Sequence, residues 1–400
     1  MHTNLLVDQM LGNCLSRLHA KLAQAVKAAV SSALRGAHLS LSQLARALEP
    51  STAMRHRIKR IDRLLGNDAL HGARQDIYRQ VAAQWLTQVG QLLVVIDWSD
   101  VTPDQRWHLL RASVAVEGRS VTLYEEIHPQ HKYGNLEVHR HFLQRLASML
   151  PAGHAPTIMT DAGFRSTWFE LVAQHRWHWV GRIRGKDMVR IGTGHWQRCT
   201  QLYPAATSDV QAFADAYYVR SHPVACRLIL LQRVPKGRTR RTHKGQRSRC
   251  RSSLKAARRG REPWLLACSP SLAHLSAQAI AGLYAQRMRI EQSFRDLKNE
   301  RLGLGLSATR SRSSRRLEIL LLIGHLAGWL LRLIGECAQQ RQMQRYFQSV
   351  GRHKREHKEI STLTLARRII DAGESWLRKL RLEQALELLR RQAQQACFVE

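Results

Sequence analysis

The sequence predicts an α/β protein, in which a core of strands and helices carries a β-rich insertion and is flanked by helical regions at both ends. From about residue 91 the pattern of apolar residues predicts segments in the order strand, strand, strand, helix, strand, helix, strand. Apolar residues recur at helical spacing before about residue 85 and again after about residue 276. Because 400 residues exceed one ordinary core, we predict three domains, which comprise residues 1–85, 86–335 and 336–400.

The net charge indicates a polyanionic partner. The chain has 63 Lys and Arg residues against 30 Asp and Glu, a formal net charge of +33, so we expect nucleic acid. A basic membrane-surface protein would share this charge. However, the best apolar run, residues 319–331, contains His325 and falls short of the roughly 18 to 20 residues that a bilayer requires. We therefore predict a buried helix and no membrane partner.

The cysteines and the N-terminus favour a cytoplasmic protein. The seven cysteines are scattered and form no C-x-x-C, which suits neither a disulfide framework nor a zinc site, so we expect reduced and mostly buried thiols. The 20 histidines show no H-E-x-x-H spacing, which argues against a zinc hydrolase. The first 30 residues lack the order of a signal peptide.

The N-terminal helical region contains a basic stretch that is a candidate for DNA binding. After a helix breaker at Pro50, the stretch "RHRIKRIDR" sets five cations around Ile58 and Ile61. It can bury one face and present cations on the other. The candidate DNA-binding residues are Arg55, Arg57, Lys59 and Arg60, with Arg63 beside them. A merely solvated basic helix remains the alternative.

Two aspartates are predicted at strand ends in the core. The run "QLLVVIDWSD" is typical of a strand buried on both faces and ends in Asp97. "LRASVAV" and "SVTLYEEI" follow and predict an antiparallel hairpin with Gly118 in its turn. After a helix at residues 135–150, the strand "APTIMTDAGF" ends in Asp161. A second helix and an aromatic-rich strand complete the core.

Residues from about 185 to 268 form the predicted insertion. Short β-like runs surround the segment "PKGRTRRTHKGQRSRCRSSLKAARRGRE", which is dense in cations and poor in apolar residues. We predict no regular structure for this segment in the free protein. A basic loop can nevertheless become ordered on DNA phosphates.

The stretch "YAQRMRIEQSFRDLK", residues 284–298, combines a packing face with a polar face. On one ideal helix, Arg287, Glu291 and Lys298 lie within about 60° of one another, beside an apolar stripe. An exposed ion pair between Glu291 and Arg295 would contribute only about 0.3 to 0.5 kcal/mol, so stability alone is a weak reason for this arrangement.

Glu291 with Asp97 and Asp161 would suit a two-metal site. Phosphodiester chemistry uses Mg²⁺ to activate an attacking oxygen and to stabilise a leaving one, and Mg²⁺ takes oxygen ligands. Three other acids are left out of this triad. Asp100 lies beyond the predicted strand end, and Glu125 and Glu126 alternate across a strand and cannot face one site together.

The spacing Tyr284-x2-Arg287-x3-Glu291-x6-Lys298 matches the Y-R-E-K signature of bacterial insertion-sequence DDE transposases, and the chain resembles that family. "KRIDRLLGN", "IDWSD", "LRASVAV", "GRSVTLYE", "TDAGF" and "EPWLLA" resemble most the cut-and-paste, hairpin-forming members carried by composite tetracycline-resistance transposons. The resemblance covers most of the chain and is most specific over residues 55–305.

The resemblance implies a ribonuclease-H-like nucleotidyl-transferase core that acts on double-stranded DNA, namely inverted-repeat ends and target DNA. It implies a homodimer in the synaptic complex and catalytic Mg²⁺, for which Mn²⁺ could substitute. The implied metal ligands are Asp97, Asp161 and Glu291. The implied phosphate contacts are Tyr284, Arg287 and Lys298, and Trp264 in "EPWLLA" would stack on a flipped base.

Several alternatives stay open. The chain could be a related nuclease that cuts DNA without joining it, or a DNA-binding regulator without enzyme activity. Trp264 could simply pack in the insertion sheet. Trp98 and Trp329 match no family position, and we predict that both lie in the core.

Overall fold

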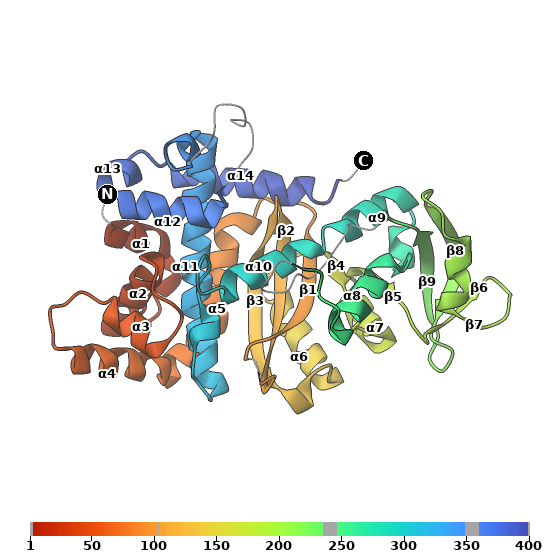
Figure 1. Cartoon of the computed structure of the whole chain (residues 1–400), viewed down its shortest axis with the longest axis horizontal. Coiled ribbons are helices and arrows are strands. Elements are labelled where there is room, and N and C mark those ends of the chain that lie inside the picture. Colours follow the sequence, from red (N-terminus) through yellow and green to blue (C-terminus); the bar gives the residue numbers. More distant parts are fainter. Residues whose placement is uncertain (1–2, 103, 235–245, 349–359, 399–400) are drawn as a thin grey trace. The chain divides into compact units, whose positions relative to one another are not determined.

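The computed structural model describes residues 3–102, 104–234, 246–348 and 360–398 (Figure 1). It forms two compact units. The first unit combines the chain up to His154 with Met288–Ala396, and the second comprises Ala155–Arg287. All seven cysteines are free thiols, and five of them are buried, as predicted.

The first unit begins with helices, which confirms the predicted helical N-terminus. They are α1 (Thr3–Leu11), α2 (Ala20–Leu34), α3 (Leu41–Arg46), α4 (Met54–Leu65) and α5 (Asp68–Leu86). Side chains before two of them cap the first turn: Ser40 accepts a hydrogen bond from the backbone N–H of Gln43, and Asn67 accepts one from Leu70.

Three antiparallel strands follow in the spatial order β3-β2-β1: β1 (Leu93–Asp100), β2 (Trp107–Val116) and β3 (Arg119–Pro129). Gly118 takes a φ of +67° in the predicted hairpin turn. Leu93–Ile96 are buried as expected, but β1 does not end at Asp97. It pairs with β2 as far as Asp100 opposite His108, because this ladder continues beyond the apolar run.

Helices cover both faces of this small sheet. On one face lies α6 (Leu136–Ala147), whose His139 Nε2 accepts a 3.3 Å hydrogen bond from the indole N–H of Trp98. Trp98 is only half-buried, so the prediction that it lies in the core is wrong. On the opposite face α10 (Met288–Lys298) crosses the strands (Figure 1).

The long helix α11 (Ser314–Gln340) forms the core of the first unit. By length and composition it could cross a membrane, but 83% of its most apolar stretch is buried inside the protein. Trp329 is 3% exposed. Both results confirm the sequence predictions. The C-terminal helices α12 (Thr362–Ala372) and α14 (Leu382–Gln395) pack on α11, with a short α13 (Glu374–Leu377) between them.

The second unit contains a mixed sheet in the order β4-β5-β10-β9-β8-β6-β7. Only β4 and β5 pair in parallel; the other described pairs are antiparallel. The helices of this unit include α7 (Ser166–Gln174) and α9 (Ala277–Ala285). The strands are β4 (Thr157–Thr160), β5 (His178–Ile183), β6 (Met188–Ile191), β7 (Gln197–Arg198), β8 (Gln211–Tyr218), β9 (Val224–Leu231) and β10 (Trp264–Cys268).

The basic segment of the insertion differs from the prediction. Arg251–Arg261 form a helix, α8, because Arg, Lys, Ala and Leu favour helices even where charge is dense. Residues 235–245 of the same segment lie outside the described part of the chain.

The sequence predicted one helix over residues 284–298, but the structure has two helices there. Helix α9 ends at Ala285 and α10 begins at Met288. The N–H groups of Gln286 and Arg287 bond to the carbonyls of Leu283 and Tyr284 at 3.0 and 3.1 Å. These bonds, which reach back only three residues, tighten the last turn and end α9.

Candidate active site

Asp97 lies on the face of the three-stranded sheet that α10 covers. Side chains alternate along a strand, so Asp97 and Ser99 share this face. Arg111 lies directly opposite Asp97 on β2 and therefore projects to the same side. Asp97 is half-buried, and its Oδ1 accepts a 2.8 Å hydrogen bond from the N–H of Trp98. The strand thus holds this carboxylate close to its own backbone.

Arg111 is fixed by a buried carboxylate. Its Nε and Nη2 lie 2.7 and 2.6 Å from Glu125 Oε2, and Tyr78 donates a 2.9 Å hydrogen bond to Glu125 Oε1. The guanidinium lies 5.0 Å from the centre of the Phe294 ring on α10. Glu125 is therefore an arginine partner, which agrees with leaving it out of the metal set. The Arg111 guanidinium, which Glu125 holds in place, therefore packs against the Phe294 ring and helps to hold α10 on the sheet.

Helix α10 packs through Ile290, Phe294 and Leu297, which are buried. Glu291 lies in its first turn and is half-buried. Lys298 lies in its last turn and donates a 2.7 Å hydrogen bond from Nζ to Ser99 Oγ. Burial lowers the pKa of Lys298; Asp100 opposes this effect and Arg111 adds to it. Helix α10 therefore places the partly desolvated ammonium group of Lys298 against β1, the strand that contains Asp97.

Asp161 follows β4 directly, as predicted, and belongs to the second unit. It is half-buried, and its Oδ1 accepts a 2.7 Å hydrogen bond from the N–H of Gly163. A Cβ at Gly163 would lie 2.9 Å from that oxygen, closer than real contacts allow. A side chain at this position would therefore push the Asp161 carboxylate away from its place beside the Gly163 N–H.

Trp264 is the first residue of β10 and contacts two other side chains. The edge of one ring meets the face of the other between Trp264 and Tyr284, with centroids 5.0 Å apart and an interplanar angle of 85°. The guanidinium of Arg233 lies 4.4 Å from the centre of the Trp264 ring. Tyr284 is buried, whereas Trp264 is half-buried. The fold thus brings together two of the predicted DNA-binding residues.

A family model described as "Transposase DDE domain" matches residues 89–330, more than half of the chain. The chain belongs to the DDE transposase family. Comparison with curated proteins finds no match. Membership implies that this transposase carries out metal-dependent nucleotidyl transfer on DNA. Its mixed α/β architecture, with helices beside the strands, agrees with the predicted ribonuclease-H-like core.

The predicted site residues of the transposase are distributed over both units. The first holds Asp97, Glu291 and Lys298, and the second holds Asp161, Trp264, Tyr284 and Arg287. Within the described residues, no three His, Cys, Asp or Glu side chains gather closely enough to hold a metal ion. The donor set nevertheless fits one by its chemistry, because three carboxylates supply the oxygen ligands that Mg²⁺ prefers.

The acids excluded from the triad have structural partners in the transposase. Asp100 lies 3.1 Å from Nδ1 of His108. Glu126 pairs with Arg145 at 2.6 Å and with His128 at 2.9 Å. Glu125 and Glu126 therefore have separate sets of partners, as expected for neighbours on one strand.

The predicted N-terminal cations lie on α4. Arg55, Lys59 and Arg60 are exposed there. Arg57 differs, because its Nη1 donates to the carbonyls of Arg46 and Leu48 at 3.2 and 3.1 Å and so closes the end of α3. Ile61 is buried, but Ile58 is 37% exposed, so only part of the predicted apolar face is covered.

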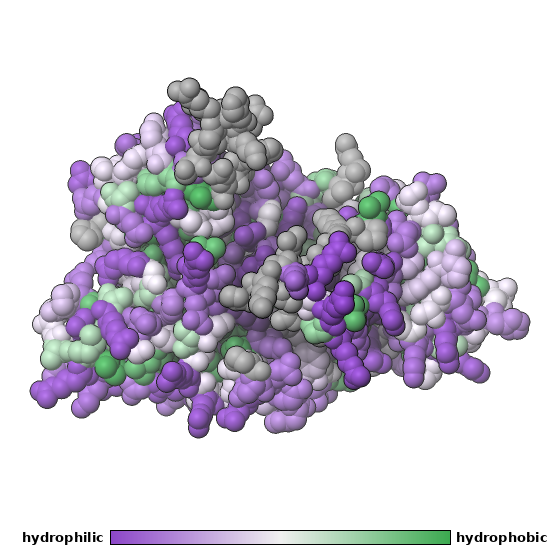
Figure 2. Space-filling model, in the orientation of Figure 1, coloured by the Kyte–Doolittle hydropathy of each residue, from purple (hydrophilic) through white to green (hydrophobic). Residues whose placement is uncertain are grey.

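Sequence reasoning missed three features of the transposase. Ser99 and Arg233 contact Lys298 and Trp264, and no local pattern marks either contact. Helix α8 presents five exposed cations, none of which forms an ion pair within the described residues, and strongly hydrophilic side chains cover this region (Figure 2). They are Arg251, Lys255, Arg258, Arg259 and Arg261.

Proposed function

We propose that this transposase binds the inverted-repeat ends of an insertion sequence, cuts both strands through a DNA hairpin and joins the 3′ ends to target DNA. The observation that supports this best is that the family match covers residues 89–330. That region includes both predicted aspartates and the full Y-R-E-K spacing. The activity would be phosphodiester hydrolysis followed by transesterification.

In this proposal Asp97, Asp161 and Glu291 hold the catalytic metals. Mg²⁺, or Mn²⁺ in its place, would supply an activated attacking oxygen and stabilise the leaving oxygen. The contribution of the chain is to fix the carboxylates. The N–H groups of Trp98 and Gly163 hold one oxygen of each aspartate, and the packing of α10 holds Glu291.

Lys298, Tyr284 and Arg287 would hold phosphates of the cleaved end. The Ser99 hydroxyl keeps the Lys298 ammonium at β1, so less conformational entropy is lost when a phosphate binds. Trp264 would stack on the flipped base of the hairpin. Such a contact contributes roughly 1 to 3 kcal/mol, and the edge contact with Tyr284 steadies the ring for it.

The helical regions would recognise DNA and a second copy of the chain. We propose that residues 1–85 read the ends through the exposed cations of α4, with Arg57 closing the helix junction beneath them. Residues 336–400 would contribute to a homodimer that pairs two ends. The protein would act in the bacterial cytoplasm, on nucleoid DNA.

The direct test is metal-dependent cleavage of DNA that carries the inverted repeats flanking the gene. Asp97→Ala and Glu291→Ala should abolish cleavage in Mg²⁺ and leave binding of the ends intact. Asp209→Asn, at an exposed loop acid, is the matched control and should cleave normally. Cleavage by either alanine variant would refute the triad.

The same assay separates the alternative functions. Joined product with target DNA supports a transposase, whereas cleavage without joining indicates a related nuclease. Binding of ends without metal-dependent cleavage by the wild-type chain would indicate a regulator.

A further inference from the structure

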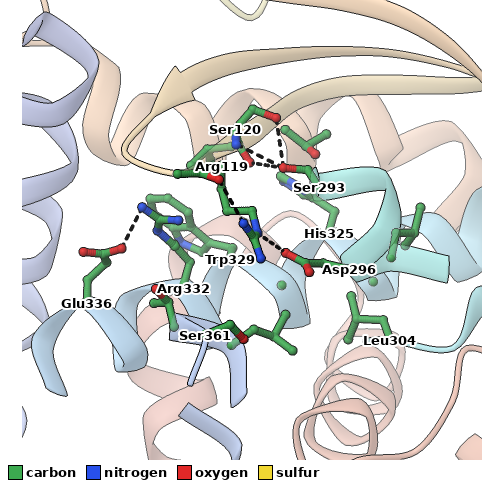
Figure 3. A pocket seen from close by; sticks show the side chains of 18 of the residues that line it. Arg119, Ser120, Ser293, Asp296, Leu304, His325, Trp329, Arg332, Glu336 and Ser361 are labelled. Carbon is green, nitrogen blue, oxygen red and sulfur yellow. Dashed lines mark hydrogen bonds and ion pairs between the residues drawn. The ribbon is translucent and has the colours of Figure 1, made fainter. Parts of the chain in front are cut away.

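Two side chains of α10, Asp296 and Ser293, bond to the start of β3 at the turn between β2 and β3, and neither is proposed to bind metal or DNA. Figure 3 shows both contacts at the wall of a pocket in the first unit. Asp296 Oδ2 lies 2.6 Å from Arg119 Nε, and these side chains are 27% and 30% exposed. Arg119 also donates a 2.9 Å hydrogen bond from Nη1 to the carbonyl of Gly118 within the turn. The guanidinium of Arg119 therefore joins the turn to α10.

Ser293 bonds to the backbone of β3 at Ser120. Its hydroxyl accepts hydrogen bonds from the N–H and the Oγ of Ser120, both at 3.0 Å, and donates one to the Ser120 carbonyl at 2.9 Å. β3 is the outer strand of the group β3-β2-β1, and every second residue of such a strand turns its backbone polar groups away from the neighbouring strand. One hydroxyl on α10 therefore satisfies both backbone groups of a residue at an open strand edge.

The turn between β2 and β3 is fixed in addition by α11. Arg332 Nη2 donates a hydrogen bond to the carbonyl of Glu117 and another to Oε1 of Gln392 on α14, both at 3.1 Å. Glu336 lies 2.6 Å from the same nitrogen, and the Arg332 side chain is 10% exposed. The turn is thus anchored to the core of the first unit and can act as a fixed support for α10.

The residues that contact the turn lie on the opposite side of α10 from the proposed catalytic groups. At about 100° per residue, Ser293 and Asp296 lie about 160° and 140° around the helix from Glu291, whereas Lys298 lies about 20° from it. Rotation of α10 about its axis would therefore break the contacts with the turn and move Glu291 at the same time. A rotation of about 10° moves a carboxylate that lies about 6 Å from the axis by about 1 Å. A misplacement of about 1 Å can lower a rate about 100-fold.

We propose that Arg119, Ser293 and Asp296 are positioning residues that fix the rotation of α10 and thereby the place of Glu291 in the metal site. The apolar face of α10 holds the helix on the sheet, but apolar packing is non-directional, whereas hydrogen bonds specify an orientation. The three residues act through Glu291 and touch neither metal nor DNA. This inference rests on the proposed function and adds to it the means by which the third carboxylate is held.

Hydrogen exchange in the free, full-length protein tests the contact without reference to activity. In Ser293→Ala/Asp296→Ala, exchange of the α10 amides at residues 290–298 should accelerate at least about tenfold more than exchange in α11, because α10 loses its support and opens locally. Glu170→Gln removes a 2.6 Å contact with His222 in the second unit and should leave exchange in α10 unchanged. Equal acceleration in both helices, or none, overturns the proposal.

Metal-dependent cleavage of the transposon ends tests the consequence for Glu291. The double alanine variant should cleave about 100-fold more slowly and require about tenfold more Mg²⁺ for its half-maximal rate, with binding of the ends unchanged. Arg119→Glu and Asp296→Arg each place like charges together and should lower the rate. Arg119→Glu/Asp296→Arg restores an opposite pair and should recover at least about tenfold of the loss.

The outcomes separate this role from the proposed function. Normal cleavage and a normal Mg²⁺ requirement in the double alanine variant would refute the positioning role alone. Failure of the reversed pair to recover activity would refute the contribution of Arg119 and Asp296. Absence of cleavage by the wild-type protein would refute the proposed function, and this role with it.

Discussion

Lys298 on α10 donates a 2.7 Å hydrogen bond to Ser99 on β1, although 199 residues separate them in the chain. Ser99 follows Asp97 by two positions, so the bond fastens the last turn of α10 to the strand face that carries the first predicted metal ligand. The lysine of the Y-R-E-K spacing is thereby tied to the same strand as an aspartate.

Ser99→Ala should lower cleavage roughly tenfold, because Lys298 loses the acceptor that positions it, while binding of the ends changes little. Ser99→Thr keeps a hydroxyl and should restore most of the activity. The readouts are single-turnover cleavage and end-binding titrations. Equal cleavage by the alanine and wild-type proteins would show that the bond has no role in positioning.

The pH profile of the same variants distinguishes positioning from general damage. Burial lowers the pKa of Lys298, so the ammonium, and with it the attraction to phosphate, disappears at lower pH than for an exposed lysine. Ser99→Ala removes a bond to the charged form, which should move the alkaline loss of activity to still lower pH. A variant that only misfolds would lose activity without this shift.

Gly163→Ala should reduce cleavage about tenfold or more, because a Cβ would lie 2.9 Å from Asp161 Oδ1 and displace the carboxylate. Binding of the ends should persist. Gly90→Ala is the matched control, since nothing lies within 4 Å of a Cβ at that position. Metal-dependent cleavage by the two variants is compared; normal cleavage by Gly163→Ala would contradict the role of Asp161.

Trp264→Ala should leave the first nick largely intact and reduce hairpin formation about tenfold, since a stacked base contributes roughly 1 to 3 kcal/mol. Trp264→Phe keeps an aromatic face and should retain most hairpin product. Denaturing gels resolve the nicked and hairpin species. If both steps fall equally in Trp264→Ala, the ring acts through its packing against Tyr284.

Neutralising two cations of α8 should weaken DNA binding in a salt-dependent manner. In Arg258→Gln/Arg259→Gln the plot of log affinity against log salt should become less steep, by about 2 in the magnitude of its slope. Each phosphate that the protein neutralises contributes about 0.9 to that magnitude. Arg378→Gln, at an exposed arginine paired with Glu374, should leave the slope unchanged. An unaltered slope in the double variant would mean that α8 is only a solvated face.

His139 should make folding sensitive to acid. Burial, with a smaller effect of His128, lowers its pKa from 6.5 to about 4. Between these values the unfolded chain binds the proton and the folded protein does not, so stability falls as pH drops through this window. The loss by pH 4.5 is about 2 to 3 kcal/mol. Urea unfolding at neutral and acid pH should show a smaller loss for His139→Gln.

Much of the fold followed from local pattern. The buried run at Leu93–Ile96, the glycine turn of the hairpin and the apolar helix α11 all appear where the sequence predicted them. Each depends on burial or on a backbone angle that nearby residues specify. Helix α8 was missed because its charge outweighed its helix propensity in the prediction.

The site could be predicted only as residue types and spacings. Asp97, Asp161 and Glu291 stand out as carboxylates after apolar strands and on an amphipathic helix, and they stay a prediction until cleavage is measured. The partners of Glu125 and Lys298 could not be read from the chain, because Arg111 and Ser99 reach them only through strand register and helix packing.

The sequence alone determined that this protein is basic, that its core alternates strands and helices, and which acids are available for metal chemistry. The tertiary structure decided where the helix at residues 284–298 breaks and which carboxylates neutralise arginines. The first set depends on composition and local periodicity. The second depends on hydrogen bonds and packing between segments far apart in the chain, and these form only when the fold closes.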